Sequence, residues 1–111
     1  MQKNCKAMVL AMETKGNAKV GNDQVVTRGD VSTWTYHGHV IAEFYHDTPE
    51  LYLIDAGWRT PTTKLRLNAA ALWLAEDTFK LWQEDFTWWW TTNGYPELWS
   101  GDLLLDGKDM T

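Results

Sequence analysis

Hydrophobic and polar residues alternate through the middle of the chain, from residue 31 to residue 55. Segments 31–36, 39–46 and 51–55 are rich in β-branched and aromatic residues, and they are separated by two turn-forming sequences, His37-Gly38 and Asp47-Thr48-Pro49-Glu50. Successive side chains of a strand point to opposite faces, so a period of two predicts strands. Three strands joined by short turns form an antiparallel meander.

A helical pattern begins after this meander. Proline is favoured at the first helical position, so Pro61 makes Thr60 the best N-cap, with Thr62 and Thr63 as alternatives. Residues 64–75 are good helix formers apart from Asn68 and Trp73. We expect the helix to pack across one face of the sheet. Its core contacts should include Leu65, Leu67, Leu72 and Leu74.

The period of two returns after the helix. Residues 79–82 and 86–91 should form a second hairpin around the polar sequence at 83–85. A continuous helix over 61–90 is the alternative, but β-branched and aromatic residues disfavour it. The second strand carries three consecutive tryptophans, in which Trp88 and Trp90 point one way and Trp89 the other. Either both faces of this hairpin are covered, or one is an exposed aromatic surface of the kind that binds a partner or ligand.

The two ends of the chain carry weaker patterns. Residues 1–12 form a short helix or strand, residues 13–24 a loop or loose hairpin, and residues 24–27 a short strand. Residues 96–111 should cover a sheet edge or add a short strand. The expected fold is α+β, with an antiparallel β-meander and a C-terminal β-hairpin forming one sheet and one main α-helix packed on a face. We expect a single domain over 1–111, with an N-terminal extension (1–30), a core (31–92) and a C-terminal tail (93–111).

Composition restricts the class of protein. A chain of 111 residues is the size of one domain. Folding at 12.8 kDa buries about two-thirds of the unfolded surface, so one core could hold most of the aromatic side chains, including the eight tryptophans. The formal charge of −5 disfavours nonspecific duplex DNA binding and is compatible with docking on basic protein surfaces.

Cysteine usage and hydropathy indicate the compartment. A single cysteine, Cys5, cannot form an internal disulfide, which is typical of a reducing compartment. The longest apolar stretch, 69–75, is too short to span a bilayer, and the N-terminal apolar run is shorter than that of a secretory signal. We therefore expect a cytoplasmic protein without a membrane partner.

The start of the helix is the first candidate binding site. Hydroxyl groups, cations and free helix N–H groups gather there, and together they could hold a phosphate while an indole offers a stacking plane. The alternative is structural: a threonine caps the helix, Trp58 fills the core, and Arg59 and Lys64 are solvated. The structural interpretation is the preferred one, and the cations, which are mildly unfavourable at a helix N-terminus, shift the balance only slightly towards a role in binding. The candidate residues are Trp58, Arg59, Thr62, Thr63, Lys64 and Arg66.

Other polar clusters suggest no chemistry. His37, His39 and His46 have no acidic or cysteine partner at metal-ligand spacing, so we expect solvent-facing strand histidines and no metal. The carboxylates of Glu43, Asp47, Glu50 and Asp55 should lie in turns and on the surface. No glycine-rich phosphate loop, nucleophile elbow or metal motif is present, so we expect neither a cofactor nor an enzyme.

A longer segment resembles a known group of proteins. The sequence Gly57-Trp58-Arg59-Thr60-Pro61-Thr62-Thr63-Lys64-Leu65-Arg66-Leu67-Asn68 is distinctive, and Trp82-Gln83, Trp88-Trp89 and Asp106-Gly107 accompany it. Residues 37–92 thereby resemble small bacteriophage proteins that share Gly-Trp-x-Thr-x-Thr-Thr-Lys-x-Arg-x-Asn at a strand-to-helix junction. The resemblance implies a phage origin and no particular activity. The first 30 residues and the triple tryptophan depart from that group.

Two functions are compatible with these patterns. The first is a small non-catalytic phage accessory protein in the host cell cytoplasm that binds and modulates a host or phage protein, for example as an inhibitor of host defence. Trp88, Trp89 and Trp90 are its candidate contacts, and they could also join copies into a homo-oligomer. The second is a nucleic-acid or nucleotide-phosphate binding module using the Trp58–Arg66 helix start, which the net charge disfavours.

Overall fold

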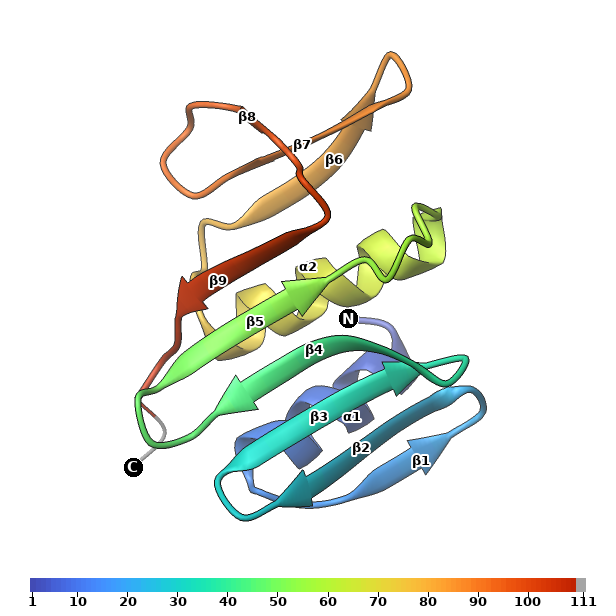
Figure 1. The fold of residues 1–111 in the computed structure, drawn as a ribbon, viewed down its shortest axis with the longest axis vertical. Coiled ribbons are helices and arrows are strands. Elements are labelled where there is room, and N and C mark those ends of the chain that lie inside the picture. The colour runs from blue at the N-terminus through green and yellow to red at the C-terminus, as the bar shows by residue number, and fades with distance from the viewer. Residues whose placement is uncertain (110–111) are drawn as a thin grey trace.

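The computed structural model describes residues 1–109, which form two helices and nine strands in two antiparallel sheets (Figure 1). The helices are α1 (Lys3–Glu13) and α2 (Pro61–Leu74). The strands are β1 (Ala18–Val20), β2 (Asp23–Arg28), β3 (Val31–Tyr36), β4 (His39–Tyr45), β5 (Glu50–Ile54), β6 (Lys80–Glu84), β7 (Thr87–Thr91), β8 (Glu97–Leu98) and β9 (Asp102–Asp106).

The larger sheet is the predicted meander, extended at both edges. Its strand order is β1-β2-β3-β4-β5-β9, and every neighbouring pair is antiparallel. The α+β class and the meander are therefore confirmed. Alternate residues of the strands, including Trp34, Phe44 and Leu53, are fully buried. The sheet carries its apolar side chains on one face, as the period of two requires.

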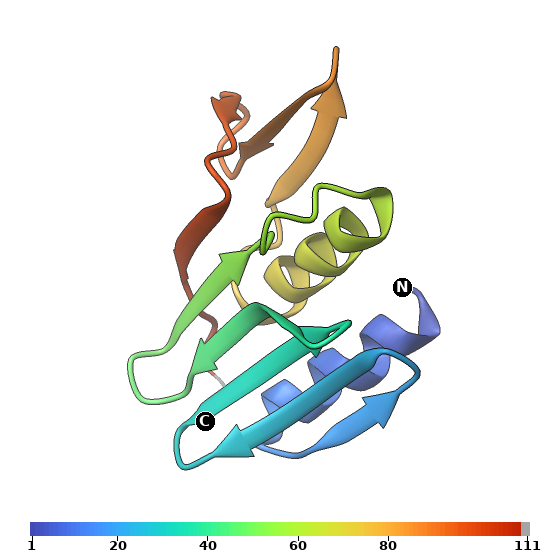
Figure 2. The same ribbon diagram turned by 45° about the vertical axis from the view of Figure 1, so that its right-hand side comes forward.

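Two helices, rather than one, cover this apolar face (Figure 2). Helix α1 begins where the side chain of Gln2 accepts a hydrogen bond from the Cys5 amide, at 3.0 Å. Its residues Met8, Val9 and Met12 are fully buried in the core. Residues 1–30 supply α1, β1 and β2, so they belong to the core rather than forming an extension to it.

Helix α2 begins as predicted. Thr60 is its N-cap and accepts a hydrogen bond from the Thr63 amide at 3.2 Å, and Pro61 follows as the first helical residue. Of the four leucines expected in the core, Leu67 and Leu74 are buried, whereas Leu65 and Leu72 are exposed. The buried positions instead follow a three-four spacing that includes Thr63, Arg66, Leu67, Ala70 and Leu74.

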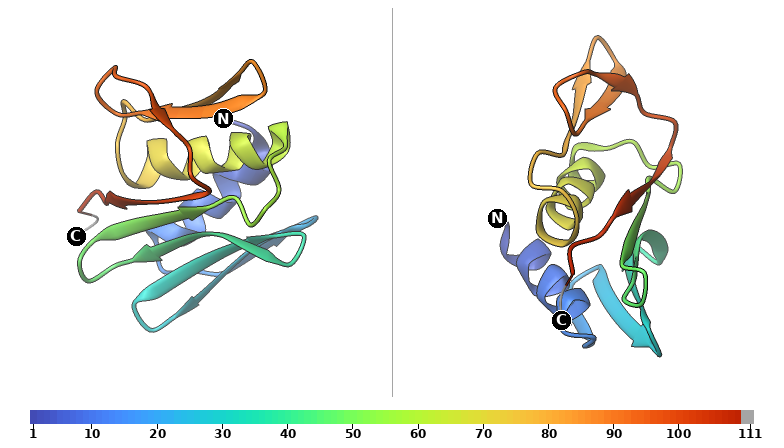
Figure 3. Two further views of the ribbon diagram at one scale, coloured as in Figure 1. Left: turned by 45° about the horizontal axis from the view of Figure 1, so that its top comes forward. Right: turned by 90° about the vertical axis from the view of Figure 1, so that its left-hand side faces the viewer.

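The predicted hairpin β6–β7 is confirmed, but it does not join the meander. With β8 it forms a separate small sheet, in the order β6-β7-β8. Helix α2 lies between the two sheets (Figure 3) and contacts β4 and β5 on one side and β6 on the other. The intervening helix prevents one continuous sheet.

Asn68 joins α2 to the small sheet. Its side-chain amide donates to the Leu81 carbonyl at 2.9 Å and accepts from the Leu81 amide at 2.9 Å. Phe79, Leu81 and Trp88 are buried and belong to the same hydrophobic core as the meander. One face of the small sheet is thus fixed to the rest of the molecule.

The C-terminal segment ties the two sheets together. Strand β8 pairs with β7, and β9 pairs with β5 along its whole length, so the tail adds strands as predicted. Gly107 then packs closely: a Cβ atom there would lie 2.7 Å from Phe44 Cε2. No helix within residues 1–109 is long and apolar enough to cross a membrane.

Candidate functional site

Arg66, a predicted phosphate ligand, forms a buried ion pair with Asp23. Arg66 Nε lies 2.7 Å from Asp23 Oδ1, and Nη2 lies 2.7 Å from Oδ2. The Trp34 indole also donates to Oδ1 at 2.9 Å, and the guanidinium lies 3.8 Å from the Tyr36 ring centroid. Burial alone would raise the pKa of Asp23, but hydrogen bonds from Arg66 and Trp34 outweigh it and hold that pKa below its usual range.

The other two predicted cations are also engaged elsewhere. Arg59 Nε lies 3.1 Å from Oδ2 of Asp55, a buried carboxylate that also accepts from the Trp99 indole at 2.9 Å. Asp55 is therefore a buried junction between β5 and the C-terminal segment, not the surface residue expected. Lys64 lies over the Trp88 ring, with Nζ 5.7 Å from its centroid. The structure does not gather the three cations around one phosphate.

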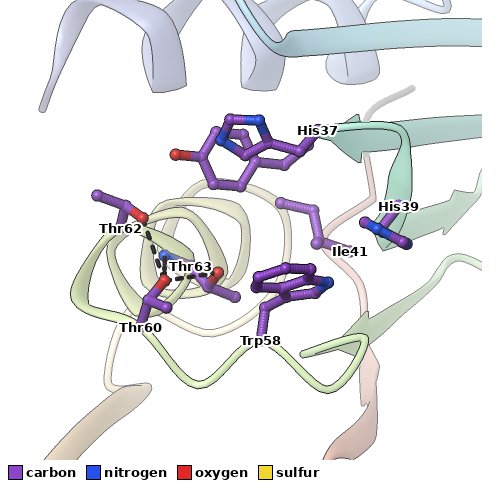
Figure 4. A pocket seen from close by; sticks show the side chains of 8 residues that line it. His37, His39, Ile41, Trp58, Thr60, Thr62 and Thr63 are labelled. Atoms are coloured by element: carbon purple, nitrogen blue, oxygen red, sulfur yellow. Dashed lines mark hydrogen bonds between the residues drawn. The ribbon is translucent and has the colours of Figure 1, made fainter.

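The remaining residues of the helix start line a pocket of about 420 Å³ (Figure 4). Trp58 is 54% exposed, so it does not fill the core. Its ring centroid lies 5.7 Å from that of His39, and the rings of His37 and Tyr36 are 4.3 Å apart. The residues that line this Trp58 pocket are Tyr36, His37, His39, Ile41, Trp58, Thr60, Thr62 and Thr63.

Three threonine hydroxyls form a directed chain on one wall of the Trp58 pocket. Thr60 Oγ1 donates to Thr63 Oγ1 at 3.1 Å. A hydroxyl carries one hydrogen, so Thr62 must be the donor in its 3.1 Å bond to Thr60. Thr63 is only 1% exposed, and no residue among 1–109 accepts its hydroxyl hydrogen. The chain thus ends on a buried donor in the wall of the pocket.

A second surface lies on the small sheet, facing away from α2. Trp82 pairs directly with Trp89, and Trp89 pairs with Leu98, so the three side chains form one row across β6, β7 and β8. Both indoles are partly exposed, and Leu98 is 64% exposed. Phe86, at the tip of the β6–β7 turn, is 95% exposed. We call Trp82, Trp89 and Leu98 the tryptophan face.

The triple tryptophan divides as its alternation predicts. Trp88 is 3% exposed and belongs to the core. Trp90 is partly buried and stacks on Phe79, with ring centroids 6.4 Å apart. Trp89 lies on the opposite face of the strand, in the tryptophan face. Of the three, Trp89 alone stands on the face that is turned away from α2.

Comparison with protein families places the chain among phage proteins. Residues 1–104 match the family described as Kyanoviridae Gp96 protein. The chain belongs to this family. No curated protein and no solved structure matches it. The Gp96 match includes both the Trp58 pocket and the tryptophan face, and it bears out the resemblance to small phage proteins.

A serine–histidine contact in this Gp96 family member has no catalytic geometry. Ser32 Oγ lies 2.8 Å from His46 Nε2 and 2.7 Å from Thr27 Oγ1, which itself donates to the Gly16 carbonyl. Ser32 must therefore donate to Thr27 and accept from the imidazole. His46 does not accept the serine proton, and Ser32 is fully buried. Burial, followed by repulsion from Lys15, lowers the pKa of His46.

The other histidines lie at the protein surface. His37 and His39 are exposed and flank the Trp58 pocket. Within the described part of the chain, no three side chains of histidine, cysteine, aspartate or glutamate are arranged to hold a metal ion.

Sequence reasoning missed part of both surfaces. The pocket residues Tyr36, His37, His39 and Ile41 lie in or beside the β3–β4 turn, and no local pattern places that turn next to Trp58. The position of Trp82 beside Trp89 could have been predicted from the sequence, because Trp82 stands in the strand that pairs with the triple tryptophan. The burial of Arg66 could also have been predicted, because Arg66 follows Thr63 by three positions and precedes Ala70 by four, a spacing that places all three on the same face of the helix.

Proposed function

We propose that this Gp96 family protein is a non-catalytic phage accessory protein that binds and modulates a host or phage protein in the host cytoplasm. The observation that carries the proposal is the tryptophan face. Trp82, Trp89 and Leu98 stand in one row on the face of the small sheet that is turned away from α2; the two indoles are partly exposed and Leu98 is exposed. Exposed tryptophans are common at the energetic centres of protein interfaces.

The charges beside the tryptophan face favour a protein partner. On β6, Lys80 and Glu84 stand two positions before and after Trp82, on the same face of the strand. On β7, Thr87 and Thr91 flank Trp89 in the same way. An apolar centre between a cation and an anion suits a partner with the opposite order of charges. Such a mixed pattern offers little to a polyanion such as nucleic acid.

A second copy of the chain would also match this pattern, because rotation about the row places Lys80 over Glu84. The sheet is small, however. Three strands of at most five residues cover about 250 Å², whereas each partner in a standard interface buries about 800 Å². Self-association through this face alone should be weak. A larger host or phage protein that also contacts Phe86 fits the surface better, and inhibition of a host-defence enzyme is one form of such modulation.

Site-specific crosslinking tests the proposal. A photo-crosslinking amino acid at Thr87, beside the tryptophan face, should capture a discrete protein from infected host cells. The same probe at Leu104, an exposed position on β9, is the control. Once the captured protein is purified, Trp89→Ala should weaken its binding about 30-fold or more, which corresponds to about 2 kcal/mol for a central tryptophan. Leu104→Ala should leave the affinity unchanged.

Two outcomes would count against a heterologous partner. Crosslinks only between copies of this chain, with a dimer in analytical ultracentrifugation that Trp89→Ala dissociates, would assign the face to self-association. Equal capture from positions 87 and 104, together with wild-type affinity in Trp89→Ala, would remove the tryptophan face from binding altogether.

A further inference from the structure

We propose that the Trp58 pocket binds a nucleobase ring: a planar, uncharged heterocycle with a hydrogen-bond acceptor on its edge. The pocket shares no residue with the tryptophan face. Its volume of about 420 Å³ lies in the range of about 300–1,000 Å³ that is usual for small-molecule sites. This site is therefore large enough for a base and its sugar.

The walls of the pocket suit a flat ring. Trp58 leaves half of its surface exposed beside His39. His37 lies on the opposite side of the pocket (Figure 4), with its ring 4.3 Å from that of Tyr36. Ile41, which is almost fully buried, forms an apolar floor. Bases of any sequence stack on such aromatic side chains, because every base has a π face.

The hydroxyl of Thr63 selects for an acceptor on that ring. Thr63 accepts from Thr60 and keeps its own hydrogen without an acceptor among residues 1–109, although it is almost fully buried. A buried donor without an acceptor is costly, so a group that accepts its hydrogen bond is stabilised there. Ring carbonyl oxygens and ring nitrogens of nucleobases are such acceptors. The phenyl ring of a phenylalanine side chain is not.

The charges around the pocket favour an uncharged ligand. Arg66, which lies against the pocket residue Tyr36, is neutralised by Asp23. Arg59, next to Trp58 in the chain, is paired with Asp55. Neither guanidinium is left to neutralise a phosphate, and the whole chain carries a formal charge of −5. A free base or nucleoside should therefore bind better than a nucleotide or a single strand.

Titration calorimetry with defined probes tests this inference. Adenosine, guanosine, cytidine and uridine are compared with their monophosphates, with an oligothymidylate and with N-acetyl-tryptophanamide. At least one nucleoside should bind, and its monophosphate should bind less tightly. Trp58→Ala should weaken binding about tenfold or more, as expected for loss of one stacking surface. Thr63→Val should weaken it as well, whereas Thr63→Ser, which keeps the hydroxyl, should not.

Controls separate binding from folding. Tyr95→Ala removes an exposed aromatic ring in the β7–β8 connection, outside the pocket, and should bind like the wild type. Thermal melts establish that each variant is folded, and Trp58→Ala should melt like the wild type because Trp58 is exposed.

Three results would overturn the inference. The first is the absence of nucleoside binding at millimolar concentration, and the second is equal binding by folded Trp58→Ala. The third is a preference for N-acetyl-tryptophanamide that Thr63→Val does not change, which would assign the pocket to an aromatic side chain of a peptide. Tighter binding of oligothymidylate, lost in Trp58→Ala, would support the base site but overturn its assignment to an uncharged ligand. All these readouts are independent of protein capture by the tryptophan face.

Discussion

The body of the molecule, meaning α1, α2 and the six-stranded sheet, and the outer face of the small sheet use tryptophan in opposite ways. In the body, Trp34 is fully buried and its indole donates to the Asp23 carboxylate. In the small sheet, Trp82 and Trp89 turn partly exposed rings away from α2 and donate no side-chain hydrogen bond within residues 1–109. Trp34 thus helps to specify the fold, whereas the other two are the residues that we propose contact a partner.

The difference follows from what covers each sheet face. Within the described residues, every buried side-chain nitrogen or oxygen makes at least one hydrogen bond, Thr63 Oγ1 as the acceptor from Thr60, and the buried carboxylate of Asp23 is paired with Arg66. The small sheet is covered by α2 on one side only. Its inner residues therefore contribute to stability, and under the proposed function its outer residues contribute to binding. Stability and binding measurements on single variants can separate these two contributions.

The largest expected effect is in the body, at the buried ion pair. Arg66→Met leaves the Asp23 carboxylate buried without its main partner, which typically costs about 3–5 kcal/mol. Chemical denaturation should show this loss in the free energy of unfolding. Arg28→Met, at an exposed arginine on β2, is the matched control and should change stability by less than about 0.5 kcal/mol.

The double variant Asp23→Leu/Arg66→Met sharpens the interpretation. It removes both charges, so it should recover part of the stability that Arg66→Met loses. If Arg66→Met unfolded at the same denaturant concentration as the wild type, the ion pair would not hold α2 against the sheet, and the distinction between the two regions would fail.

The next effect compares two adjacent tryptophans of the small sheet. Trp88→Ala removes a core side chain and should cost about 3–5 kcal/mol, at or just below the loss expected for Arg66→Met. Trp89→Ala removes a ring from the open face and should cost less than about 1 kcal/mol while it weakens partner binding. Denaturation and affinity should therefore rank the two variants in opposite orders. Equal losses of stability would mean that both faces of the small sheet are covered.

Local features of the fold were predictable from the sequence, and contacts between distant segments were not. The meander, the Thr60 cap and the opposite orientation of Trp88 and Trp89 follow from spacings of a few residues. The Asp23–Arg66 pair joins residues 43 positions apart. Asp23 follows a glycine-containing turn, so local patterns alone predict a loop residue at this position.

The same limit applies to the candidate sites. The residue types at the helix start could be recognised in the sequence, but Asp23, the partner of Arg66, comes from a distant segment. Asp55, the partner of Arg59, stands only four residues before it, but it also accepts a hydrogen bond from the distant Trp99. Whether the hairpin joins the meander depends on tertiary packing, because α2 lies between the two sheets. Periodicity indicates which face of a strand is apolar, but it does not indicate which element covers that face.

The smallest expected effect is a pH dependence at one end of the body. Because the pKa of His46 is lowered in the folded state, the unfolded chain takes up a proton first as the pH falls. The stability associated with His46 is fully present above about pH 6.5 and decreases below it, as the unfolded histidine is protonated. His46→Gln removes this titration and keeps an amide that can donate to Ser32. Denaturation between about pH 7.5 and 5 should therefore show a steeper loss for the wild type than for His46→Gln. Parallel curves would mean that protonation of His46 is not coupled to folding, and the hydrogen bond to Ser32 would then tolerate a charged imidazole.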